Sequence, residues 1–203
     1  MKNIIKYIAI TLLVLNVSCN TEYLDPNSTL EPDVVNNTDK LIELINGVQK
    51  RWSTDRSGAI YTSVHISGLN AKELRLLNPG NLGEAEIDLG GDDVDGGNEL
   101  LNNIWTNVML CRKEATTVID AADIATEDTQ LANSLKAYGL FYRALSHGTL
   151  IQYFEQIPLE IVENAQFSDK SAVLQNAIAD LTEAKGYIAS GLSSAVISGV
   201  FDS

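Results

Sequence analysis

The stretch from Leu131 to Leu159 constrains the fold more than any other part of the chain. Apolar residues recur there at steps of three and four, which places one row of them on a single helical face: Leu131, Leu135, Tyr138, Tyr142 and Leu145. A second apolar row on the same stretch contains Ala137, Phe141, Ala144, Gly148 and Ile151. A helix that is apolar on two sides must be covered on both. We therefore predict a central helix within an all-α scaffold.

Both ends of this helix are marked in the sequence. Thr126 is the expected N-cap, and Glu127 and Asp128 follow it with charges that suit the positive end of a helix dipole. Pro158 lacks a backbone N–H and disfavours helical geometry at the preceding residue. The helix is therefore expected to end at residues 153–155. Its length of roughly 27 residues exceeds the usual 8 to 20 and favours an all-helical fold.

Two further helices are predicted upstream from apolar stripes with the same spacing. Thr38 is expected to cap a helix over residues 39–52, and its stripe ends at Trp52, which we assign to the core. A second helix is expected over residues 99–122. Its stripe contains Cys111, which is predicted to be a buried thiol. A short link then leads into the central helix, so these two should form an antiparallel hairpin.

The last predicted helix begins at Ser168 or Ser171 and stops at Gly191. Its apolar stripe needs a partner, and it consists of Leu174, Ala177, Ile178, Leu181, Ala184 and Ile188. No later helix in the sequence is left to cover this stripe.

Residues 53–98 have no helical period and are rich in glycine, so we predict a long irregular loop insertion there. Long loops of this kind are often binding regions. Tyr61 is the only aromatic residue in it, and with Asn81 and Asn98 it is a candidate ligand-binding residue. The alternative for the asparagines is that they form turns. The scarcity of aromatic side chains argues against a conventional sugar-stacking platform.

The N-terminus has the organisation of a bacterial export signal. Two lysines precede an apolar run over residues 7–15, which is too short for a membrane-spanning helix of about 20 residues. Val17, Ser18 and Cys19 then resemble a lipobox. We predict a lipoprotein signal peptide over residues 1–18 and lipidation of Cys19, with an ordinary secretory signal as the alternative. Residues 19–37 are expected to be a polar tether, and residues 38–203 a helical domain.

The formal charge of −13 argues against nucleic acid as a partner, because phosphates require lysine and arginine. The acidic run over residues 92–99 is predicted to be a solvated loop, since its spacing fails the EF-hand pattern, and calcium binding is the alternative. His65 and His147 are expected to be structural. No nucleophile elbow, phosphate-binding loop or metal-spaced cluster is present, so we predict a protein without enzymatic activity or cofactor.

Residues Arg143–Ala144, Leu150, Tyr153–Phe154 and Ile157–Leu159 resemble the helix-and-exit pattern of the SusD/RagB family. The sequence departs from that pattern at three places. His147 stands where the family usually has Tyr, Glu155 where it has Gly, and Tyr138–Gly139 where it has Glu-Ala.

The resemblance implies tetratricopeptide-like helical hairpins in a surface-exposed lipoprotein of the cell outer membrane in Bacteroidota. It also implies a nutrient ligand, usually a glycan, and delivery to a SusC-like TonB-dependent transporter. Because family members are more than twice as long, the chain is expected to be an N-terminal portion, with a short, degenerate member as the alternative. A helical-repeat interaction protein without a glycan site is the alternative function.

Overall fold

The computed structural model describes residues 31–54, 56, 58–78, 80–194 and 196, which belong to a compact unit beginning at Glu31. In this part of the chain the structure is predominantly helical, with helices α2 to α8 and one two-stranded antiparallel sheet. The predicted all-α class is confirmed. Cys19 and the predicted signal peptide lie outside the described residues.

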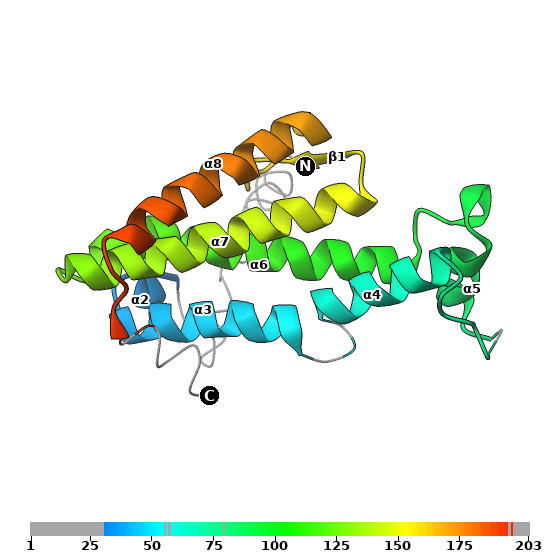
Figure 1. Ribbon diagram of the computed structural model, residues 1–203, viewed down its shortest axis with the longest axis horizontal. Helices are drawn as coiled ribbons and strands as arrows, with labels where there is room; N and C mark the ends of the chain where they lie inside the picture. The colour runs from blue at the N-terminus through cyan, green and yellow to red at the C-terminus, as the bar shows by residue number, and fades with distance from the viewer. Residues whose placement is uncertain (1–30, 55, 57, 79, 195, 197–203) are drawn as a thin grey trace, which may run out of the picture. The chain divides into compact units, whose positions relative to one another are not determined.

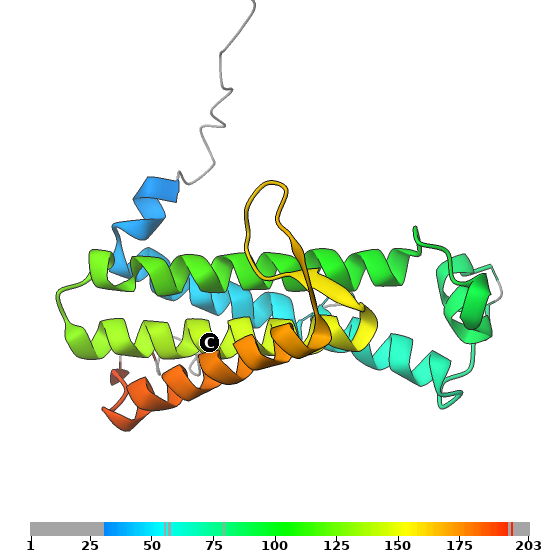
Figure 2. The same ribbon diagram turned by 90° about the horizontal axis from the view of Figure 1, so that it is seen from above.

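Helices α6 (Glu99–Ala125) and α7 (Thr129–Tyr153) form a long antiparallel hairpin (Figures 1 and 2). Helix α8 (Lys170–Ala189) packs on α7, and α3 (Thr38–Ser53) packs mainly on α6. Helix α7 is therefore covered on two sides, as its two apolar rows predict. On α3 the stripe Leu41, Ile45, Val48 and Trp52 is buried, which confirms Trp52 as a core residue.

Helix α7 begins at Thr129, three residues after the predicted cap at Thr126. Its N-cap is Asp128, whose Oδ1 accepts hydrogen bonds from the backbone N–H groups of Gln130 at 2.9 Å and Leu131 at 3.1 Å. A carboxylate accepts these hydrogen bonds, and its negative charge is also stabilised by the positive end of the helix dipole. A threonine hydroxyl can accept the hydrogen bonds but carries no charge. The predicted end of the helix is confirmed at Tyr153.

The cap of α3 is also displaced from its predicted position. Asn37, not Thr38, is the N-cap, and its Oδ1 accepts from the backbone N–H of Lys40 at 3.1 Å. The Thr38 hydroxyl instead donates to the carbonyl of Ala125 at 2.6 Å. This bond ties the start of α3 to the last residue of α6, a long-range contact that local sequence cannot reveal.

Helix α8 is capped by Asp169, not by Ser168 or Ser171. The Asp169 Oδ1 atom accepts from the backbone N–H of Ala172 at 2.9 Å. At the other end, Gly191 has a φ of +94°, which is common for glycine just beyond a helix and agrees with the predicted stop.

The stretch predicted as a polar tether, residues 19–37, contains helix α2 (Glu31–Val35). Val34 and Val35 are partly buried against the hydrophobic core, and α2 contacts both α3 and α6. Two valines therefore attach the last part of this stretch to the folded body, because they bury apolar surface there.

The prediction of an irregular loop over residues 53–98 is wrong. This stretch contains helix α4 (Ala59–Asn70), helix α5 (Leu82–Leu89) and a single 3₁₀ turn, η1 (Gly91–Asp93). Two of the glycines that suggested a loop stand at helix ends: Gly58 is the N-cap of α4, and Gly90, with a φ of +72°, is the C-cap of α5. Glycine at these positions marks the ends of helices and does not exclude helices from the stretch.

After α7 the chain makes a short hairpin that the sequence did not predict. Strand β1 (Gln156–Pro158) pairs with β2 (Phe167–Asp169), and Ile157 in its centre is fully buried opposite Ser168. The Arg112 side chain of α6 donates hydrogen bonds to the carbonyls of Pro158 and Glu160. The exit after Pro158 is thus held against α6.

Helix α7 contains two glycines, Gly139 and Gly148. Gly139 is the one that packs closely against α6. A Cβ atom there would lie 2.7 Å from Ile119 Cγ1 and 2.9 Å from the carbonyl oxygen of Ala115, whereas one at Gly148 has nothing within 4 Å. We expect Gly139→Ala to lower the free energy of unfolding by about 1–3 kcal/mol through overpacking. Gly148→Ala on the same helix should raise it by about 0.5–1 kcal/mol. Urea denaturation measures both, and equal effects would contradict this account.

Candidate functional site

A cleft of about 450 Å³ lies between α4, the chain that follows it and the start of α5. We call it the α4–α5 cleft. These two helices lie at one end of the helical arrangement in Figure 1. The lining side chains combine apolar, amide and charged groups, and they are Arg56, Tyr61, Val64, His65, Leu69, Leu74, Arg75, Leu76, Leu77, Asn78, Asn81 and Glu84.

Part of the cleft lining is apolar and accessible. Tyr61 is 42% exposed, and its ring meets the edge of the His65 ring with centroids 5.5 Å apart. Val64 and Leu77 are also exposed. An exposed aromatic ring supported by a neighbouring ring can pack against the C–H face of a sugar.

The cleft lining also carries polar groups. Asn78 donates from Nδ2 to Oδ1 of Asn81 at 3.3 Å, and Asn81 donates in turn to Glu84 Oε1 at 3.5 Å. Two atoms of the lining, Nδ1 of His65 and Oε2 of Glu84, are buried and have no hydrogen-bond partner within the described part of the protein. Buried polar atoms without partners are rare in folded proteins, so these two atoms have unused hydrogen-bonding capacity beside the cleft.

The structure brings two of the three predicted ligand-binding residues, Tyr61 and Asn81, into one cleft. The third, Asn98, is only 3% exposed and is the N-cap of α6. Its Oδ1 accepts from the backbone N–H groups of Leu100 and Leu101, and its Nδ2 donates to Gly83 O at 3.0 Å and Glu86 Oε2 at 2.8 Å.

Asn98 is therefore structural and does not contribute to the cleft. In the sequence, Asn98 directly precedes Glu99, and an asparagine followed by an acidic residue is typical of the start of a helix. His65, Arg75 and Glu84 were not among the predicted ligand-binding residues, because their proximity depends on how α4 and α5 pack.

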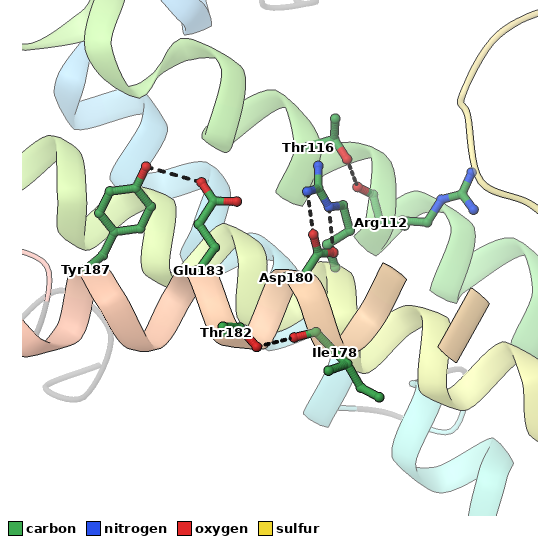
Figure 3. A network of polar contacts seen from close by, with 8 residues as sticks. Arg112, Thr116, Ile178, Asp180, Thr182, Glu183 and Tyr187 are labelled. Carbon is green, nitrogen blue, oxygen red and sulfur yellow. Dashed lines mark hydrogen bonds and ion pairs between the residues drawn. The ribbon is translucent and has the colours of Figure 1, made fainter. Parts of the chain in front are cut away.

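A second group of polar residues is enclosed between α6, α7 and α8. We call Arg112, Arg143, His147 and Asp180 the buried charge cluster. Arg143 donates two hydrogen bonds to Asp180, at 2.7 and 2.9 Å, and Asp180 is only 4% exposed. Figure 3 shows these two bonds reaching Asp180, while the Arg112 guanidinium points away from it. The cluster is a structural part of the helix packing.

Burial is the main cause of the lowered pKa values of two members of this cluster, Arg112 and His147. Burial and the charge of Arg143 lower the pKa of Arg112 to about 10. Burial, together with the charges of Arg112 and Arg143, lowers the pKa of His147 to about 4, although Asp180 opposes this shift. His147 is 1% exposed, so the expectation that it is structural agrees with its environment.

Cys111 is also buried, and its Sγ lies 3.9 Å from the carbonyl oxygen of Val48. Burial and the charge of Glu114 raise its pKa to about 12. Because the thiolate is the reactive form, this thiol is unreactive near neutral pH. Its burial confirms the prediction.

In the acidic run over residues 92–99, the Asp92, Asp93 and Asp95 side chains are exposed, and the Asp95 carboxylate accepts from the backbone N–H of Gly97 at 2.6 Å. Across the described residues, no group of three or more His, Cys, Asp or Glu side chains has a metal-binding arrangement.

None of the helices within the described residues is long and apolar enough to cross a membrane.

Comparison of the chain with protein-family models, with curated proteins and with solved structures finds no match.

Proposed function

We propose that this protein is a surface-exposed lipoprotein of SusD/RagB type, anchored to the outer membrane through Cys19. It binds an oligosaccharide in the α4–α5 cleft and delivers it to a SusC-like TonB-dependent transporter. The sequence supports this proposal through the lipobox-like Val17–Cys19 segment and the pattern over residues 143–159. The proposal assigns the protein no catalytic step and no cofactor.

The observation that carries the binding proposal is the composition of the cleft. Sugar-binding sites pair an aromatic surface for the C–H face with amides and carboxylates for the hydroxyl groups. Tyr61 supplies the first feature, and Asn78, Asn81 and Glu84 supply the second. The carboxylate of Glu84, whose Oε1 accepts from Asn81 Nδ2, adds an acceptor group to the lining.

We expect Tyr61→Ala to weaken oligosaccharide binding about tenfold, because it removes an aromatic contact of about 1 kcal/mol and apolar surface beneath the sugar. Tyr61→Phe should bind within about twofold of the native protein, since the Tyr61 hydroxyl makes no hydrogen bond within the described residues. Calorimetric titration with a panel of neutral and charged oligosaccharides measures these affinities.

Phe167 provides a matched control because it is an exposed aromatic residue outside the cleft, 58% accessible and stacked on Trp105. Phe167→Ala should leave oligosaccharide affinity unchanged. Weakened binding in Phe167→Ala together with native affinity in Tyr61→Ala would place the ligand at the β-hairpin and refute the proposed site.

The anchor and the transporter are tested together on the full chain in its native membrane. Solubilisation in mild detergent, affinity purification and mass spectrometry should find acyl chains on Cys19 and a TonB-dependent barrel in the same complex. A Cys19→Ala variant should lose the acyl chains and fractionate away from the outer membrane. An unmodified native protein without a barrel would refute this part of the proposal.

The alternative function, a helical-repeat interaction protein, is favoured by an apolar face on α7 and α8. Leu174, Ile178, Leu181 and Phe141 are all about half exposed and line one open groove of about 300 Å³. Exposed apolar surface of this kind is typical of protein contacts. Native co-purification of a protein partner, combined with no binding across the oligosaccharide panel, would favour this function.

A further inference from the structure

The α4–α5 cleft has an unusual charge for this protein. The chain has a formal charge of −13 and only five arginines, yet two of them, Arg56 and Arg75, line this one cleft. The other three lie outside the cleft lining. Arg51 pairs with Glu114 at 2.8 Å, Arg143 pairs with Asp180, and Arg112 donates to backbone carbonyls.

Arg75 is the arginine best placed to meet a ligand. It is exposed, lines the cleft, and makes no hydrogen bond or ion pair with any residue in the described ranges. The one carboxylate in the lining is Glu84, and the Asn81 amide donates to it. A guanidinium group binds a carboxylate or sulfate through two parallel hydrogen bonds, which an ammonium group cannot reproduce.

The net charge of the protein does not prevent an anion from binding here. At physiological ionic strength, exposed charges are screened beyond about 8 Å. An anionic group in the cleft therefore responds most strongly to the charged side chains that line it, Arg56, Arg75 and Glu84, and less to acidic residues farther from the cleft.

We propose that the α4–α5 cleft selects an anionic oligosaccharide. Arg75 binds the sugar's carboxylate or sulfate, while Glu84 and Asn81 bind its hydroxyl groups. Tyr61 packs on its C–H face. This inference rests on the proposed oligosaccharide-binding function and adds the chemical class of the ligand.

The test uses pairs of ligands that share one sugar backbone and differ in charge. Oligogalacturonate and its methyl-esterified form compare a carboxylate with a neutral ester, and sulfated and unsulfated galactose oligosaccharides provide the corresponding sulfate comparison. Calorimetric titration is carried out with the native chain, Arg75→Gln and Lys185→Gln. Lys185 is exposed on α8 outside the cleft, so its variant removes the same charge elsewhere.

We expect the native protein to bind an anionic member of one pair at least about tenfold more tightly than its neutral partner. Arg75→Gln should abolish this preference while retaining binding of the neutral form, and Lys185→Gln should retain the preference. The pair that shows the preference identifies carboxylate or sulfate as the recognised group.

Other outcomes separate this inference from the proposed function. Equal binding of charged and neutral forms, or an unchanged preference in Arg75→Gln, would overturn the inference and leave oligosaccharide binding intact. Absence of binding to every member of the panel would overturn both.

Discussion

Arg143→Met is expected to lower the free energy of unfolding by about 3 kcal/mol or more, because it leaves the carboxylate of Asp180 buried without its partner. Asp180 is 4% exposed and receives both of its hydrogen bonds from Arg143, at 2.7 and 2.9 Å. Denaturant unfolding followed by circular dichroism measures the loss.

Two variants test whether the loss comes from the unpaired charge. The double variant Arg143→Met, Asp180→Leu should recover most of the stability, since an apolar pair can replace a buried ion pair at little cost. Lys170→Met breaks an exposed ion pair with Glu155, 2.9 Å long, and should cost less than about 1 kcal/mol. Equal losses in Arg143→Met and Lys170→Met would contradict the explanation.

The second large effect is a loss of stability in acid caused by His147. In the folded protein, burial and the nearby charges of Arg112 and Arg143 lower the pKa of His147 to about 4 from its ordinary value of 6.5. As the pH falls, His147 is therefore protonated at a higher pH in the unfolded chain than in the folded protein. The contribution of neutral His147 to the free energy of unfolding is fully present above pH 6.5. It decreases as the pH falls toward 4, by about 3 kcal/mol in total.

His147→Leu should remove this contribution. Both ring nitrogens of His147 are buried without a hydrogen-bond partner among the described residues, so an apolar side chain should be tolerated at pH 7.5. Carboxylates titrate in the same range in both proteins, so the relevant quantity is the difference in unfolding free energy between native protein and variant at each pH. A difference that stays constant from pH 7.5 to 4 would refute the role of His147.

The sequence predicted the helices with clear apolar stripes because each stripe reports directly on burial. It predicted α3, α6, α7 and α8, with boundaries that differ by about three residues or fewer. Local sequence does not specify the caps, because several candidate oxygens adjoin each helix start and tertiary contacts select among them. Thr38 shows this, since its hydroxyl bonds to Ala125 and leaves Asn37 as the cap.

Helices α4 and α5 were missed for a different reason. In α4 the buried residues include Thr62 and Gly68, and the exposed ones include Ile60 and Val64, so burial does not follow a simple apolar stripe. The short β-hairpin was missed because each of its strands has three residues, and one contains a proline. Packing against neighbouring elements stabilises these segments more than their local pattern does.

By itself, the sequence determined the helical class, the central position of α7 and the burial of Trp52 and Cys111, because apolar periodicity specifies which faces avoid water. It also supplied Tyr61 and Asn81 as candidates. Only the tertiary structure decided that these two share a cleft with Arg75 and that Asn98 does not. The physical reason is that a cleft forms where helices pack, so its members come from separate segments whose proximity no local pattern encodes.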